Sequence, residues 1–162
     1  MIKDVIGILH DLADAYREIY KISLEKKEAI VSNNVQHVGE IVKLEWEALG
    51  RISDLEEKRL LVVRELVPGE DTADPTIEDV CQYVSPEEAA ELEGAAEELR
   101  LLVGKQKKIN AENQALIDLH LDYMDYMINV FLKEPQTSNV YGNSGEVEDD
   151  SLDNRGIIDS SV

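Results

Sequence analysis

The longest stretch of the chain without a helix-breaking residue constrains the fold most. Ser85, Pro86 and Glu88 form a capping box with proline at the first helical position, a pattern that predicts the start of a helix. The next proline is Pro135, so a single helix is expected over residues 86–133. At 1.5 Å per residue this helix is about 70 Å long, and it must find partners along that length.

Apolar residues recur along this segment at alternating spacings of three and four, which is typical of a coiled-coil seam. The amides of Gln106, Asn110 and Asn113 interrupt the middle of the seam; we call these three residues the polar layer. Buried amides lower stability but fix register, because only one alignment satisfies their hydrogen bonds. We therefore expect the polar layer to mark where the long helix meets specific partners. The full seam comprises Ala89, Leu92, Ala96, Leu99, Val103, Gln106, Asn110, Asn113, Ile117, His120, Met124, Met127 and Phe131.

Three further helices are predicted before this segment. Residues 2–32 and 35–67 carry apolar side chains at heptad-like spacing. Asn33 and Asn34 between them suit a C-cap and an N-cap, and such a short turn forces an antiparallel hairpin. A short helix is expected over residues 75–83. The apolar residues of the second helix are Val35, Val38, Val42, Trp46, Leu49, Ile52, Leu60, Val63 and Val67.

The fold class that follows is all-α, with an antiparallel helical hairpin and one long helix in a three-helix, coiled-coil-like bundle over residues 1–133. The composition changes after this bundle. Residues 134–162 are rich in Asn, Ser, Gly and Asp, with seven acidic residues against one Arg. This composition is typical of a flexible acidic tail.

The charge balance excludes several classes of partner. The chain has 35 acidic and 16 basic side chains, a net charge of −19. Nucleic acids and anionic membrane surfaces attract clustered Lys and Arg, so both are poor partners. No apolar run is long enough to span a bilayer, and the N-terminus lacks the pattern of a signal peptide. We expect a cytoplasmic protein without direct membrane insertion.

No constellation of residues indicates catalysis. Di-iron and di-manganese helical bundles use Glu-x-x-His motifs, but the residues three positions before His10, His37 and His120 are Gly, Asn and Ile. The many carboxylates have the spacing of a solvated helix surface, and the lone Cys81 has no partner for a disulfide. We expect no enzyme, no cofactor and no metal.

The end of the long helix indicates binding instead. Asp118, Asp122, Asp125 and Asn129 form one narrow polar stripe, and almost every other residue in 116–132 is apolar. So broad an apolar arc has to be covered on more than one side, either within the chain's own bundle or by the tail, a second copy or a helix of another protein. The candidate docking residues are Leu116, Leu119, Tyr123, Met124, Met127, Ile128 and Phe131.

Three short motifs resemble the FlgN family of flagellar export chaperones. They are LEEKR at 55–59, INAENQALI at 109–117 and VYGNSGEV at 140–147, and they occur in matching order along essentially the whole chain. The base-free segment 68–84 and the very acidic end of the tail depart from the family pattern.

The resemblance implies a bacterial cytoplasmic chaperone that holds hook-associated (hook–filament junction) proteins before flagellar type III secretion. In that family the C-terminal part binds an amphipathic terminal helix of the cargo, and the complex is presented to the membrane export platform. Asn110 and Asn113 match the family's paired Asn. Tyr141 and Gly142 match its tail element and are the candidate export-platform contact.

Two other functions remain open at the level of sequence. One is a structural or adaptor coiled coil that associates with its own kind, and a homo-oligomer is compatible with the free form of the chaperone as well. The other is an unrecognised metalloenzyme of the bundle type.

Overall fold

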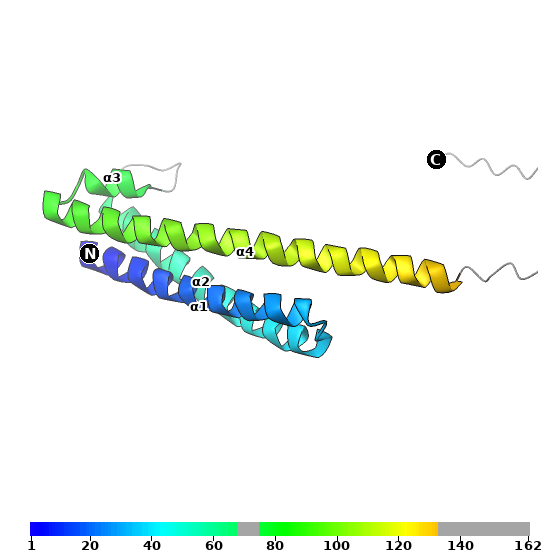
Figure 1. The fold of residues 1–162 in the computed structure, drawn as a ribbon. Coiled ribbons are helices and arrows are strands. Elements are labelled where there is room, and N and C mark those ends of the chain that lie inside the picture. Colours follow the sequence, from blue (N-terminus) through cyan, green and yellow to red (C-terminus); the bar gives the residue numbers. More distant parts are fainter. Residues whose placement is uncertain (68–74, 133–162) are drawn as a thin grey trace, which may run out of the picture.

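The structure, a computed structural model, describes residues 1–67 and 75–132, and within these ranges it consists of α-helices joined by short turns, with no strand (Figure 1). The all-α prediction is thus confirmed. The predicted acidic tail, including Tyr141 and Gly142, lies outside the described residues. The four helices are α1 (Ile2–Val31), α2 (Val35–Leu66), α3 (Ile77–Cys81) and α4 (Pro86–Leu132).

The turn between α1 and α2 depends on two asparagines. Asn33 has a positive φ of 56°, a conformation that Asn tolerates better than most residues because its short polar side chain bonds locally. Asn34 caps α2, its side chain accepting a hydrogen bond from the backbone N–H of His37 at 3.2 Å. The chain reverses within three residues, and α1 and α2 form the predicted antiparallel hairpin.

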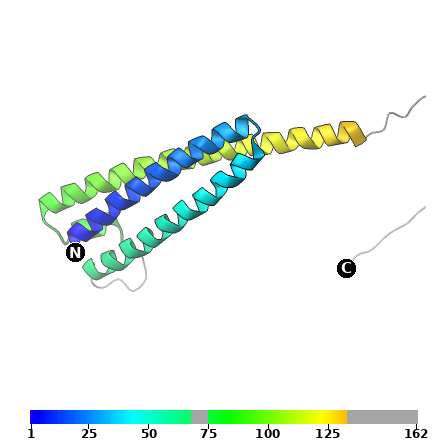
Figure 2. The same cartoon turned by 90° about the horizontal axis from the view of Figure 1, so that it is seen from below.

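Helix α1 is the centre of the bundle. It packs along both α2 and α4, whereas α2 and α4 hardly touch each other, and Figure 2 shows them diverging on the two sides of α1. Helices α1 and α4 run in the same direction, as two ion pairs show. Arg17 pairs with Glu98 and, further along both helices, Lys27 pairs with Glu112. The bundle is consequently open between α2 and α4.

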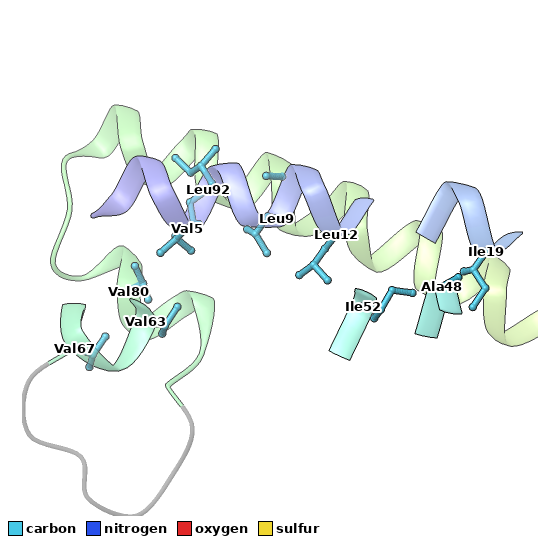
Figure 3. Packing of buried hydrophobic residues seen from close by; sticks show 12 residues of the cluster. Val5, Leu9, Leu12, Ile19, Ala48, Ile52, Val63, Val67, Val80 and Leu92 are labelled. Atoms are coloured by element: carbon cyan, nitrogen blue, oxygen red, sulfur yellow. The ribbon is translucent and has the colours of Figure 1, made fainter. Parts of the chain in front are cut away.

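The apolar core extends from the end of the bundle where α4 begins to the middle of α1 and α2 (Figure 3). The short helix α3 closes this end, and its Val80 is completely buried. A capping box in which the side chains of Thr76 and Asp79 satisfy each other's backbone N–H groups fixes the start of α3. The core cluster includes Val5, Leu9, Leu12, Ile19, Ala48, Ile52, Val63, Val67, Val80 and Leu92.

Helix α4 begins where its sequence predicts. The Glu88 carboxylate accepts hydrogen bonds from the backbone N–H of Ser85 at 3.1 Å and from its hydroxyl at 2.9 Å. In return the Ser85 hydroxyl accepts from the N–H of Glu88 at 3.3 Å. Bonds to its ionised form lower the pKa of Glu88 below its usual value. The long helix thus has a fixed first turn beside the open end of the hairpin.

Replacing leucine by alanine should destabilise the fold strongly at a buried position and very little at an exposed one. Leu12 is fully buried, whereas Leu61 on α2 is 56% exposed. Leu12→Ala should lower the free energy of unfolding by about 2–5 kcal/mol through lost burial and a residual cavity. Leu61→Ala should change it by less than about 0.5 kcal/mol. Urea denaturation of both variants measures the difference, and equal effects would contradict this description of the core.

Candidate docking site on the long helix

Helix α4 extends beyond the end of the hairpin formed by α1 and α2. Lys27, near the end of α1, pairs with Glu112 at 2.7 Å, and α1 ends only four residues later, at Val31. Because the two helices run parallel, α4 leaves its neighbours near Ile117. Its last 15 or so residues, about 22 Å of helix, extend beyond the turn of the hairpin (Figures 1 and 2).

This projecting end (residues 118–132) is largely apolar and exposed. Apart from Met127, its large apolar side chains retain between 49% and 76% of their accessible surface. Among the candidate docking residues, five are exposed, while Leu116 at the base of the projection and Met127 within it are partly buried. Sequence reasoning included Leu119, Tyr123, Met124, Ile128 and Phe131 among the candidates, but omitted the equally exposed Leu121, Tyr126, Val130 and Leu132.

One edge of the projecting end is acidic. Asp118, Asp122 and Asp125 are exposed and follow one another at helical spacing. None of them forms an ion pair with any residue in 1–67 or 75–132; Asp118 accepts one hydrogen bond, from Gln114 at 2.8 Å. The projecting end therefore combines a wide apolar surface with uncompensated negative charge.

The polar layer lies just before the projection, and the structure divides its members. Gln106 and Asn113 are buried, at 5% and 1% exposure, but Asn110 is exposed. Ile109 takes the buried place instead. A straight helix with 3.6 residues per turn drifts relative to a 3.5-residue seam, by about 20° per heptad, and this drift moves Asn110 outward and Ile109 inward.

A serine that the sequence did not single out is the common partner of these amides. Ser23 of α1 is fully buried. Gln106 donates from Nε2 to its hydroxyl at 2.8 Å and to Oδ1 of Asn110 at 3.1 Å, and Asn113 donates from Nδ2 to the carbonyl oxygen of Ser23 at 2.8 Å. The only available signal was a small polar residue at a seam position of α1. The polar layer thus sets the register of α4 on α1.

Helix α2 joins this network through a shielded ion pair. Lys26 and Glu45 approach to 2.6 Å with side chains only 14% and 13% exposed, and the Ser23 hydroxyl lies 3.3 Å from Oε1 of Glu45. The network is incomplete, because Oε1 of Gln106 and Oδ1 of Asn113 are buried without a hydrogen-bond partner among residues 1–67 and 75–132. Such orphan acceptors cost roughly 1–3 kcal/mol each.

Other predicted features lie away from the projecting end. Burial and the neighbouring carboxylates of Glu93 and Glu78 raise the pKa of the Cys81 thiol, which disfavours the reactive thiolate. Trp46, a seam position by sequence, is 71% exposed, because the buried side of α2 passes through Glu45 and Ala48 instead. His120 is partly buried, its Nδ1 lying 2.8 Å from the carbonyl oxygen of Leu116.

The described part of the chain contains neither a cluster of metal ligands nor a membrane-spanning helix. Within residues 1–67 and 75–132, no three or more His, Cys, Asp or Glu side chains gather in a way that could hold a metal ion. None of the helices described there is both long and apolar enough to cross a bilayer.

Replacing the two asparagines by leucine should have different effects. Asn113→Leu removes a buried orphan acceptor beside a groove with room for the larger side chain, so it should raise the free energy of unfolding by about 1 kcal/mol. Asn110→Leu, at an exposed position, should change it by less than about 0.5 kcal/mol. Thermal unfolding of the two variants measures both effects; destabilisation by Asn113→Leu would mean that its single bond to Ser23 outweighs the orphan oxygen.

Comparison with known protein families agrees with the resemblance noted in the sequence. The family model described as FlgN protein matches residues 1–149, which is nearly the whole chain. Comparison with the curated proteins and with the solved structures found no significant match. The matched range includes all four helices together with the element around Tyr141. The chain belongs to the FlgN family, which implies a chaperone role in flagellar protein export.

Proposed function

We propose that this protein is a cytoplasmic chaperone that binds and masks the terminal amphipathic helix of hook-associated (hook–filament junction) proteins and delivers them to the flagellar type III export apparatus. The observation that carries the proposal is the projecting end of α4. A soluble chain that exposes so many large apolar side chains on one helix end has a surface suited to a partner.

The shape of the projecting end fits a helical partner. An amphipathic helix docks by laying its apolar face along a complementary apolar surface, with anchors spaced at i, i+3, i+4 and i+7. Met124, Met127, Ile128 and Phe131 follow this spacing. Methionine is unbranched and adapts to different partner surfaces, which suits a chaperone that handles more than one junction protein.

The acidic edge adds a requirement for the cargo. The carboxylates of Asp118, Asp122 and Asp125 have no counter-ion among the described residues. A cargo helix with Lys or Arg beside its apolar stripe would supply the missing charge, speed association and fix orientation. Masking such a helix is reversible and needs no nucleotide, and the net charge of −19 keeps the loaded complex soluble.

Delivery is assigned to the C-terminal residues beyond α4. Tyr141 and Gly142 match the family's tail element and are proposed as the contact with the membrane export platform. Their position after the docking surface lets one chain bind cargo with α4 while it presents a separate recognition element.

A self-associating adaptor is the second function considered, because an exposed apolar arc also fits a second copy. Charge opposes it. Residues 109–132 contain four acidic residues and no Lys or Arg, so pairing two projecting ends brings like charges together. Sedimentation analysis separates the two functions: the chaperone forms a one-to-one complex with a cargo helix, whereas the adaptor remains a homo-oligomer.

Charge substitutions on the projecting end test cargo binding. Met127→Asp or Phe131→Asp should weaken the affinity for the terminal helix of a junction protein by at least about tenfold, because an apolar anchor is replaced by a desolvated charge. Leu101→Asp is the matched control, because Leu101 lies on the same helix and is 61% exposed. Titration calorimetry gives the affinities and circular dichroism the helicity. Native affinity in both variants would place the docking surface elsewhere.

The role of the tail is tested separately. Tyr141→Ala should leave cargo affinity unchanged and reduce export of junction proteins into the culture medium, because it alters delivery and not capture. Tyr83→Ala, which removes an exposed tyrosine away from the projecting end, is the control for export. Loss of cargo affinity in Tyr141→Ala would show instead that the tail takes part in cargo binding.

A further inference from the structure

A groove runs along α1 between α2 and α4. Its two sides are α2 and α4, which both pack on α1 and barely on each other. Figure 2 shows the backbones of these two helices diverging. Near the hairpin turn the groove contains a cavity of about 200 Å³, and nearer the start of α4 one of about 460 Å³. Each of the three helices contributes one apolar side chain to the lining of the cavity near the turn, Ile19 of α1, Leu49 of α2 and Ile117 of α4, and the other lining residues are polar or charged.

The α4 side of this groove continues onto the projecting end. Asn110, Gln114 and Ile117 line the cavity near the turn. Steps of four, three and four residues from Ile117 lead to Leu121, Met124 and Ile128, so these side chains share one face of the helix. All three are exposed by about half, at 54%, 56% and 49%. The groove and the apolar surface of the projecting end therefore form one continuous track.

The α2 side of the groove carries an apolar rim. Leu49, which lines the cavity, is 47% exposed, and Trp46 lies three residues before it on the same side of α2 with 71% of its surface exposed. Tryptophan is enriched among the residues that anchor protein interfaces. The two side chains extend the apolar surface from α4 onto a second helix.

We propose that the cargo helix lies along this whole track, with one end between α2 and α4 against Leu49 and Trp46 and the other end on Met124 and Ile128. This inference rests on the proposed function and adds a second contact surface to it. From Gln106 to Phe131 the track covers 26 residues of α4, a length of about 38 Å. The occupant is an amphipathic helix of comparable length.

The charges along the track fix the chemistry of this occupant. Asp118, Asp122 and Asp125 flank the outer half and require Lys or Arg on the adjoining edge of the cargo helix. In the inner half Lys26 and Glu45 already pair. The exposed amides of Asn110 and Gln114 there suit neutral polar side chains. The cargo helix is thus basic over the projecting end and neutral within the groove.

This chain's own residues fit the track less well. Residues 134–162 carry seven acidic residues and one Arg, so they are repelled by the three aspartates. A second copy of α4 brings the same aspartates with it. A basic helix from another protein is the occupant that satisfies the charge.

Two leucines on α2 provide a matched pair of variants. Leu49 and Leu44 are exposed to nearly the same extent, 47% and 46%, but five residues of helix place them about 140° apart. Leu49→Asp should weaken binding of peptides from the terminal 40 or so residues of junction proteins by about tenfold, and Leu44→Asp by less than about twofold. Thermal unfolding confirms that both variants fold.

Trp46 gives an independent readout in the unmodified chain, because it is the only tryptophan. Binding of a peptide without tryptophan should move its fluorescence emission to shorter wavelength and protect it from acrylamide quenching, since the side chain leaves water. Leu44→Asp should show the same shift, and Leu49→Asp should need more peptide to reach it.

The outcomes separate this inference from the proposed function. If Phe131→Asp abolishes peptide binding, while Leu49→Asp behaves like Leu44→Asp and Trp46 emission does not change, the cargo occupies the projecting end only and the inference is overturned. If the unmodified chain binds no junction-protein peptide, the proposed function and the inference both fail. If Leu49→Asp weakens binding but Phe131→Asp does not, the continuous track is overturned.

Discussion

A difference in helix length governs this structure. Helices α1 and α2 contain 30 and 32 residues, while α4 contains 47. Helix α3 and the capping box at Ser85 place the start of α4 beside the open end of the hairpin. Since α4 then runs parallel to α1, its excess length can only extend past the turn. The exposed apolar end follows from where the helix begins, not from weak packing along the way.

The polar layer determines how much of α4 extends beyond the hairpin. A purely apolar seam would allow α4 to slide on α1 by a heptad with little change in buried area. Ser23 fixes the register because Gln106 and Asn113 both donate to it. Oε1 of Gln106 and Oδ1 of Asn113, in the same layer, have no hydrogen-bond partner among the described residues, and a buried unpaired acceptor lowers stability. A one-heptad slip would carry about 10 Å of apolar helix into or out of the bundle.

Much of this arrangement could be predicted from local signals in the sequence. The caps at Asn34 and Ser85 and the absence of proline in α4 defined the hairpin and the long helix, and the polar stripe of Asp118, Asp122 and Asp125 identified its apolar end. Side-chain partners and exact facing could not be predicted. Heptad counting places Asn110 and Trp46 inside, but helical drift and the divergence of α2 from α4 expose both. Ser23 could be noticed only as a small polar residue at a seam position, because its hydrogen-bond partner lies on a helix 83 residues away.

Residues 118–132 extend beyond the other described helices, and this affects how fast their backbone amide protons exchange with solvent. Helical segments of this length are marginal in water unless something packs against them. Among the residues that the structure describes, no other helix packs on the projecting end, and its backbone hydrogen bonds continue from the anchored part of α4. Deuterium uptake should accordingly rise with each turn from Ile117 towards Leu132. A ligand that binds there also has to order these fraying turns. Part of the binding free energy offsets that ordering, which lowers the affinity and keeps the binding reversible.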